Sequence, residues 1–134
     1  MLKDVAVELM QDWKTPNKKF NCAEVTLRAL NQYYDLGLSE ETLKTACGFG
    51  GGMRMGDTCG IVTGGVIGLS LMFGNDDVPY NNPKLSNVVK NYLEAFNKQH
   101  GSIKCADIKL DEGCFDLIAS SMGILEKVID DAKA

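Results

Sequence analysis

Four cysteines are the residues of this sequence whose type and position are best suited to chemistry. They lie far apart, with 36, 45 and 8 residues between consecutive members. No Cys-x-x-Cys pair occurs among them, so only the tertiary fold could bring them together. Thiolates are the form of cysteine that carries out redox exchange and binds soft metals. The sequence therefore predicts a redox or metal-binding group formed by Cys22, Cys59, Cys105 and Cys114.

Each of these cysteines falls within the first turn or so of an expected helix. The residues expected to cap those helices or turns precede the cysteines: Asn21, Asp57 or Thr58, Ser102 and Asp111. Free backbone N–H groups and the helix dipole stabilise negative charge at this end of a helix. We therefore expect a lowered pKa and thiolate character for all four thiols.

The fifth cysteine, Cys47, is expected near the C-terminus of a helix that ends at Gly48, where the dipole disfavours a thiolate. Cysteine is also among the most often buried residue types and packs as a small apolar side chain. We interpret Cys47 in this way. The same interpretation is an open alternative for the other four.

Composition indicates one globular domain, residues 1–134, with 45% hydrophobic and 24% charged residues. The net charge of -4 argues against nucleic acid as a partner, because that affinity depends on clustered cationic side chains. Charges interrupt the N-terminal segment, so it lacks the apolar centre of a secretory signal. The most apolar stretch, 61–73, is shorter than the about 20 residues of a membrane span. These features predict a cytoplasmic protein that does not span a membrane.

Apolar residues recur at helical spacing through most of the chain, and no segment alternates with the period of a strand. The sequence predicts an all-α, single-domain bundle of about five to six helices with a glycine-rich loop before a buried central helix. The expected helices cover 2–13, 22–36, 39–47, 58–73 and 85–100, and a final helix begins after Asp111, with a short turn at Cys105.

Glycine is concentrated in the middle of the sequence. The segment 48–60 holds six glycines, which indicates close approaches or backbone conformations that a Cβ would prevent. Gly60, Gly64 and Gly68 then repeat every four residues on one face of the central helix. Each costs about 1 kcal/mol of helix propensity relative to alanine. We therefore expect another backbone or a cofactor to pack directly against this face, which could also be the contact of a homodimer.

Two further residues are candidates for the site. Arg54 lies in the glycine-rich loop and could stabilise the charge of a cluster, bind an anionic substrate or lower a neighbouring thiol pKa, although a solvated arginine is an equal alternative. His100 is the single histidine and has no partner ligand nearby in sequence, so we do not expect it to bind metal. The segment beginning Gly48-Phe49-Gly50 follows a helix rather than a strand, which excludes a dinucleotide fingerprint.

The sequence resembles the family of redox-active proteins named for its C_GCAxxG_C_C cysteine pattern. The resemblance is carried by Asn21-Cys22-Ala23-Glu24, by the glycine-rich segment with Cys59-Gly60 and Gly64, and by Cys105 and Cys114. It covers nearly the whole chain. Ile61 stands where the family has an alanine, so the local packing differs there.

The resemblance implies that the four cysteines are the set the family shares. The family is similar to a domain of split-Soret cytochromes in which comparable cysteines hold an iron–sulfur cluster, and its genes often lie beside transporter genes. We therefore expect an iron–sulfur cluster of the two-iron type for electron transfer, with Gly60, Gly64 and Arg54 beside it. A structural zinc site and two metal-free dithiol/disulfide pairs are alternatives. So is a non-enzymatic accessory protein that binds a transporter, a redox partner or a second copy of itself.

Overall fold

Six α-helices make up most of the computed structural model, which describes residues 1–75, 77, 82–108 and 114–134. They are α1 (Leu2–Leu9), α2 (Cys22–Tyr33), α3 (Glu40–Lys44), α4 (Gly60–Phe73), α5 (Pro83–His100) and α6 (Cys114–Lys133). Within these described ranges there is no β-strand, which confirms the all-α prediction. None of the described helices combines the length and apolarity needed to cross a membrane.

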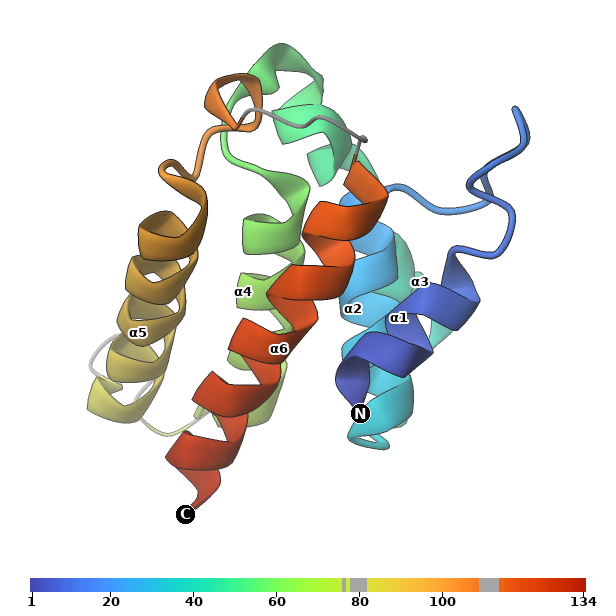
Figure 1. The fold of residues 1–134 in the computed structure, drawn as a ribbon. Coiled ribbons are helices and arrows are strands. Elements are labelled where there is room, and N and C mark those ends of the chain that lie inside the picture. The colour runs from blue at the N-terminus through green and yellow to red at the C-terminus, as the bar shows by residue number, and fades with distance from the viewer. Residues whose placement is uncertain (76, 78–81, 109–113) are drawn as a thin grey trace.

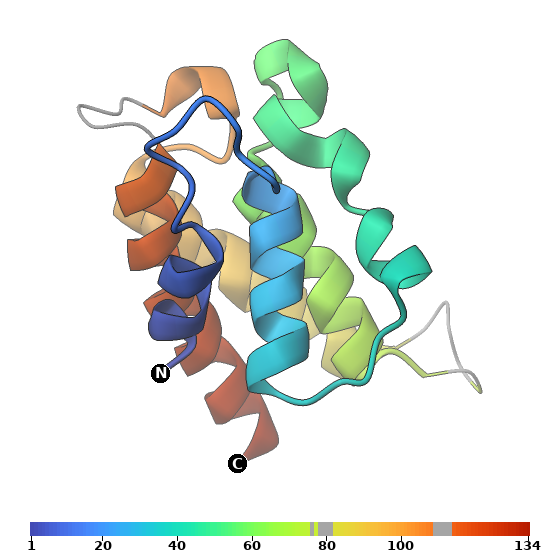
Figure 2. The same cartoon turned by 90° about the vertical axis from the view of Figure 1, so that its right-hand side faces the viewer.

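Five of the helices form a closed ring in the order α1, α2, α4, α5, α6 and back to α1, and α6 also contacts α2 and α4 across it. The short α3 packs against α2. Figures 1 and 2 show that α2, α4 and α6 begin at the same end of the bundle, where α5 ends. Three helix N-termini, each with a partial positive charge, therefore meet at one end of the protein.

The interior of the ring is filled by the apolar faces that the sequence predicts. The largest fully buried side chains come from five helices and the turn after α1: Leu2, Met10, Leu27, Leu30, Ile61, Leu69, Tyr92, Phe96, Ile118, Met122, Leu125 and Ile129. The buried Tyr92 hydroxyl donates a hydrogen bond of 2.8 Å to the carbonyl of Ile61, which joins α5 to the first turn of α4. A buried phenol needs such a partner, because an unpaired hydroxyl would lose its hydration without compensation.

The glycine face of α4 packs against α2 of the same chain. A Cβ added at Gly64 would lie 2.5 Å from the backbone oxygen of Ala23, and one at Gly68 would lie 2.3 Å from Leu30 Cδ1. The expectation that another backbone packs here is confirmed. Because α2 covers this face, its use as the contact of a homodimer is wrong, while dimerisation through another surface stays a prediction.

Some helix ends follow the sequence signals, whereas α2 ends at Tyr33 instead of residue 36 and α3 ends at Lys44 instead of residue 47. Asn21 and Asn82 cap α2 and α5 with their side chains, and Gly101 ends α5 in the left-handed region at a φ of 81°. The expected cap at Asp57 or Thr58 is wrong, since Cys59 is itself the N-cap of α4. The predicted cap Asp111 lies outside the described residues.

The first helix is shorter than predicted. It ends at Leu9 instead of Trp13, and the chain continues in tight turns with backbone hydrogen bonds from Met10 to Val7 and from Trp13 to Met10. The Asp12 carboxylate accepts a hydrogen bond of 2.9 Å from the backbone N–H of Lys19, which folds the chain back before α2. The apolar spacing continued through these turns because Met10 and Trp13 still pack on the core.

Candidate functional site

Cys22 is the first residue of α2, as predicted, and its position is fixed by the cap before it. The Asn21 side chain accepts a hydrogen bond of 3.0 Å from the backbone N–H of Glu24, and the Glu24 carboxylate accepts one of 3.2 Å from the N–H of Asn21. This reciprocal pair is a capping box. The Asn21 amide also donates to the carbonyl of Cys47, which joins the start of α2 to the segment before the glycine-rich loop.

Cys59 and Cys105 come together through a short antiparallel pairing of two loops. The N–H of Cys59 donates to the carbonyl of Ile103 at 2.7 Å, and the N–H of Cys105 donates to the carbonyl of Asp57 at 2.6 Å. An isolated bridge between residues 58 and 104 lies between these two bonds. The pairing places a cysteine of each loop at the end of the bundle where α4 begins.

Glycines allow these segments to approach the cysteines, as the sequence predicts. A Cβ at Gly60 would lie 2.4 Å from Cys22 Sγ. A Cβ at Gly52 would lie 2.6 Å from the backbone of Asp57 and 2.8 Å from Cys105 Cβ. Both positions therefore exclude any larger residue.

The glycine-rich loop contains four consecutive residues in the left-handed region. They are Gly51 (φ 65°), Gly52 (φ 64°), Met53 (φ 58°) and Arg54 (φ 62°). Two of these are not glycine, and a left-handed conformation costs such a residue about 1–2 kcal/mol. Strain of this kind is concentrated at functional sites. Here it directs the loop around the cysteines.

This strain gives a stability prediction at Met53, whose side chain is partly exposed. The substitution Met53→Gly is expected to raise the free energy of unfolding by about 0.5–1 kcal/mol, because the relief of strain exceeds the extra backbone entropy of glycine. Chemical denaturation measures the change. A decrease in stability would show that packing of the methionine, and not its backbone conformation, dominates at this position.

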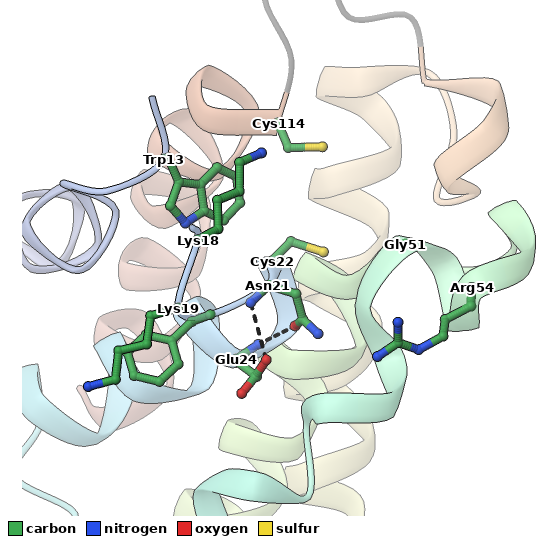
Figure 3. A pocket seen from close by; sticks show the side chains of 10 residues that line it. Trp13, Lys18, Lys19, Asn21, Cys22, Glu24, Gly51, Arg54 and Cys114 are labelled. Carbon is green, nitrogen blue, oxygen red and sulfur yellow. Dashed lines mark hydrogen bonds between the residues drawn. The ribbon is translucent and has the colours of Figure 1, made fainter. Parts of the chain in front are cut away.

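Cys114 is the first residue of α6 and faces the same open pocket as Cys22 (Figure 3). The pocket has a volume of about 560 Å³. It is lined by residues from the turn after α1, the start of α2, the glycine-rich loop and α6: Trp13, Lys18, Lys19, Phe20, Asn21, Cys22, Glu24, Gly51, Arg54 and Cys114. Two of the four predicted cysteines thus share one solvent-accessible space.

The prediction that helix N-termini lower the thiol pKa is wrong for Cys59, Cys105 and Cys114. Burial raises the pKa of Cys59 to about 12, although the backbone N–H groups of Ile61 and Val62 act in the opposite direction. Burial is also the largest cause of the raised pKa values of the other two thiols. For these side chains the loss of hydration outweighs the stabilisation of a thiolate by the helix dipole.

The other cysteines lie around Cys22, because Gly60, the residue after Cys59, packs directly against Cys22 Sγ and Cys114 shares the pocket with Cys22. Negative charge on Cys22 raises the pKa of each of the other three thiols, in addition to burial. Cys105 has the same effect on Cys59 and Cys114. Positive charge on Lys18 acts against these effects at Cys114. The fold therefore brings together the four positions that the sequence leaves far apart.

Cys47 does not behave as predicted. It is exposed, so its interpretation as a buried apolar residue is wrong. It begins the short 3-10 helix η1 (Cys47–Phe49), which replaces the last turn expected of the preceding helix. The charges that shift the pKa values of the other thiols do not include that of Cys47. The structure thus separates it from the cluster.

The two remaining candidates lie in different places. Arg54 lines the pocket and is exposed to solvent, so the alternative of a solvated surface arginine stays open. His100 is hydrogen-bonded to Ser121 Oγ at 3.2 Å and makes an edge-to-face contact with Phe96. Its ring therefore has a packing role between α5 and α6.

His100 gives a prediction for the pH dependence of stability. Burial lowers its pKa from the ordinary 6.5, so protons bind more tightly to the unfolded chain. Its contribution to the free energy of unfolding is therefore fully present above the ordinary pKa and is lost as the pH falls through the lowered one. Denaturation between about pH 8 and pH 5 should show a smaller loss of stability in His100→Gln than in the unsubstituted protein. Equal losses in the two proteins would contradict this.

In the structure, the side chains of the four cysteines are not arranged as the ligands of a metal ion. Among residues 1–75, 77, 82–108 and 114–134 no group of three or more His, Cys, Asp or Glu side chains is placed to hold a metal ion. All five cysteines are free thiols. To bind one metal centre, the cysteine side chains would have to turn toward a common point.

Sequence reasoning identified the four cysteines and Arg54 but missed the other side of the pocket. Trp13, Lys18, Lys19 and Phe20 line it, and the only signal in the sequence is that three of them immediately precede Asn21-Cys22. The pairing of residue 58 with residue 104 was also missed, because a single bridge produces no periodic pattern.

The fold and the site define a helical protein whose cysteines gather at the shared end of three helices. Residues 20–128 match the profile of the family described as "Putative redox-active protein (C_GCAxxG_C_C)". The matched segment includes all four clustered cysteines and most of the bundle, and the chain belongs to this family. Comparison with curated proteins and with solved structures gives no match.

Proposed function

We propose that the protein exchanges electrons through the thiols of Cys22, Cys59, Cys105 and Cys114, which work as dithiol/disulfide pairs. The observation that carries this proposal is the convergence of four cysteines from distant segments around Cys22, at a pocket that reaches two of them. In each exchange two thiols lose two protons and two electrons and form one S–S bond. The electron acceptor is a disulfide, which takes the two electrons and two protons and becomes two thiols.

An iron–sulfur cluster of the two-iron type is the second candidate. It is favoured by the number of thiols in the group and by the two backbone N–H groups near Cys59, because such groups stabilise the charge on ligating sulfur. The same four cysteines would hold it, and it would supply one-electron transfer. Gly60 lets the start of α4 lie directly against Cys22 Sγ, and Arg54 would balance negative charge near the site. A structural zinc ion would use the same thiols.

Anaerobic purification followed by absorption spectroscopy and analysis for iron, sulfide and zinc separates these candidates. Metal-free protein whose clustered thiols can be oxidised to disulfides and reduced again supports the dithiol function. Broad visible absorption with stoichiometric iron and sulfide supports the cluster instead. Stoichiometric zinc, in a protein whose thiols cannot be oxidised and reduced again, would contradict both the dithiol function and the iron–sulfur cluster. Because each candidate starts from reduced thiols, and the dithiol pairs must be returned to that state after each exchange, we propose that the protein works in the cytoplasm.

A protein partner belongs to the same proposal, whether a redox partner, a neighbouring transporter or a second copy of this chain. Two apolar side chains of the glycine-rich loop, Met53 and Met55, are 40% and 87% exposed, and together they offer a partner an apolar contact. A pull-down with the unsubstituted protein and with a variant in which all four clustered cysteines are serine tests the role of the thiols. Equal binding of both would favour an accessory protein that does not use its thiols.

A further inference from the structure

The pocket beside Cys22 and Cys114 has a charge opposite to that of the protein as a whole. Three cationic side chains, Lys18, Lys19 and Arg54, line it. Among the described residues that line it, the one carboxylate is that of Glu24, which is occupied by the capping box of α2. The whole chain has a net charge of -4. A local excess of positive charge on an acidic protein attracts anions to that position.

Aromatic rings hold the two lysines at the pocket. Lys18 Nζ lies 4.7 Å from the centre of the Trp13 ring, and Lys19 Nζ lies 5.3 Å from the centre of the Phe20 ring. These are distances at which an ammonium group is attracted to an aromatic face. The nearby Arg28 is already paired with Glu40 at 2.9 Å and does not line the pocket. The lysines therefore supply charge, and the rings supply an apolar wall.

Arg54 completes the site from the opposite side. Its backbone is held in the left-handed region, and its side chain extends toward the start of α2 (Figure 3). The guanidinium makes a long hydrogen bond of 3.5 Å to the carbonyl of Cys47 and, in the described part of the chain, pairs with no carboxylate. A strained residue that presents an unpaired cation to a pocket is suited to bind an anion.

We propose that this pocket binds a small anionic disulfide with an aromatic or apolar body, which is the substrate of the thiols that it contains. The inference rests on the dithiol function proposed above and adds the class of substrate. The volume of about 560 Å³ is in the range of small-molecule sites. The carboxylates of the ligand face Lys18 and Arg54, and its apolar part lies against Trp13 and Phe20.

The reaction is thiol–disulfide exchange. The thiolate of Cys114, the less buried of the two pocket thiols, attacks one sulfur of the bound disulfide and releases one ligand thiolate. The thiolate of Cys22 then attacks Cys114 Sγ in the mixed disulfide and releases the second. The protein loses two electrons and gains a Cys22–Cys114 disulfide. The two protons lost by the protein thiols are taken up by the two ligand thiolates.

The test compares two chromogenic disulfides of different charge on the full chain carrying Cys47→Ser, so that the exposed thiol does not react. The probes are the dianionic dithiobis(nitrobenzoate) and the uncharged dithiodipyridine. The double variant Lys18→Gln, Arg54→Gln is expected to slow the reaction of the anionic probe about tenfold and that of the uncharged probe less than about twofold. Lys90→Gln, an exposed lysine on α5 that lies outside the pocket, is the matched control and should change neither rate.

The ratio of the two rates separates recognition from thiol reactivity. If the two substitutions only make the thiols less reactive, both probes will react more slowly by the same factor. That result would overturn the inference about the substrate and leave the dithiol function standing. Unchanged rates for both probes would overturn it in the same way. A disulfide that forms only between another pair of the four cysteines would overturn the inference while the dithiol function stands, and the absence of any disulfide among the four would overturn the proposed function itself. Mass spectrometry of the product distinguishes these cases, and circular dichroism checks that the variants fold.

Discussion

Replacing Cys22 with serine is expected to slow the formation of a protein disulfide by at least about a hundredfold, while Cys47→Ser keeps the rate of the unsubstituted protein. Cys22 is the thiol whose charge acts on all three of the others. It also shares the pocket with Cys114. Without it, a mixed disulfide at Cys114 loses its neighbouring thiol and must wait for one from solution, so the advantage of intramolecular reaction is lost.

The measurement is the number of free thiols that remain after mixing with an oxidised disulfide, followed over time by alkylation and mass spectrometry. The Cys22→Ser substitution is made in the Cys47→Ser protein, and the Cys47→Ser protein itself is the control, so that the exposed thiol reacts in neither. A rate for Cys22→Ser equal to that of the control would show that the pocket thiols do not work as a pair. A mixed disulfide that accumulates at Cys114 in Cys22→Ser would identify the attacking residue directly.

Much of the fold could be predicted from the sequence, since local chemistry determines it. Asn21 is followed three residues later by Glu24, and the two form the capping box that fixes the start of α2. The four-residue spacing of Gly60, Gly64 and Gly68 predicts a close contact with another backbone, which α2 provides. The four cysteines could be singled out by their residue type, and Asn21 before Cys22 and the glycines around Cys59 mark two of them.

The parts that could not be predicted depend on contacts between distant segments. Cys59 and Cys105 meet because two loops exchange backbone hydrogen bonds, and backbone groups carry no side-chain signature. The pocket needs Lys18 and Arg54 on opposite sides of Cys22, a relation that exists only in three dimensions. The direction of the thiol pKa values was wrong for the same reason, because burial depends on what covers a side chain and not on its place in a helix.

Gly64 allows the close contact between α4 and α2, the helix that begins with Cys22. The substitution Gly64→Ala is expected to lower the free energy of unfolding by about 2 kcal/mol or more, since its Cβ would lie 2.5 Å from the backbone oxygen of Ala23. A backbone atom inside α2 cannot turn away as a side chain would, so the two helices must separate. The helix propensity of alanine offsets only about 1 kcal/mol of this.

Gly123→Ala is the matched control for this substitution, and it is expected to have the opposite sign. Gly123 also lies inside a helix, α6, but a Cβ there would meet nothing within 4 Å. The free energy of unfolding of this variant should therefore rise by about 0.5–1 kcal/mol, from helix propensity alone.

Urea denaturation of both variants measures the difference in the free energy of unfolding. If both stabilised the protein, α2 and α4 would not touch as closely as described. Because Cys22 and Ala23 are adjacent in α2, separation of the helices in Gly64→Ala should also slow disulfide formation, whereas Gly123→Ala should leave it unchanged.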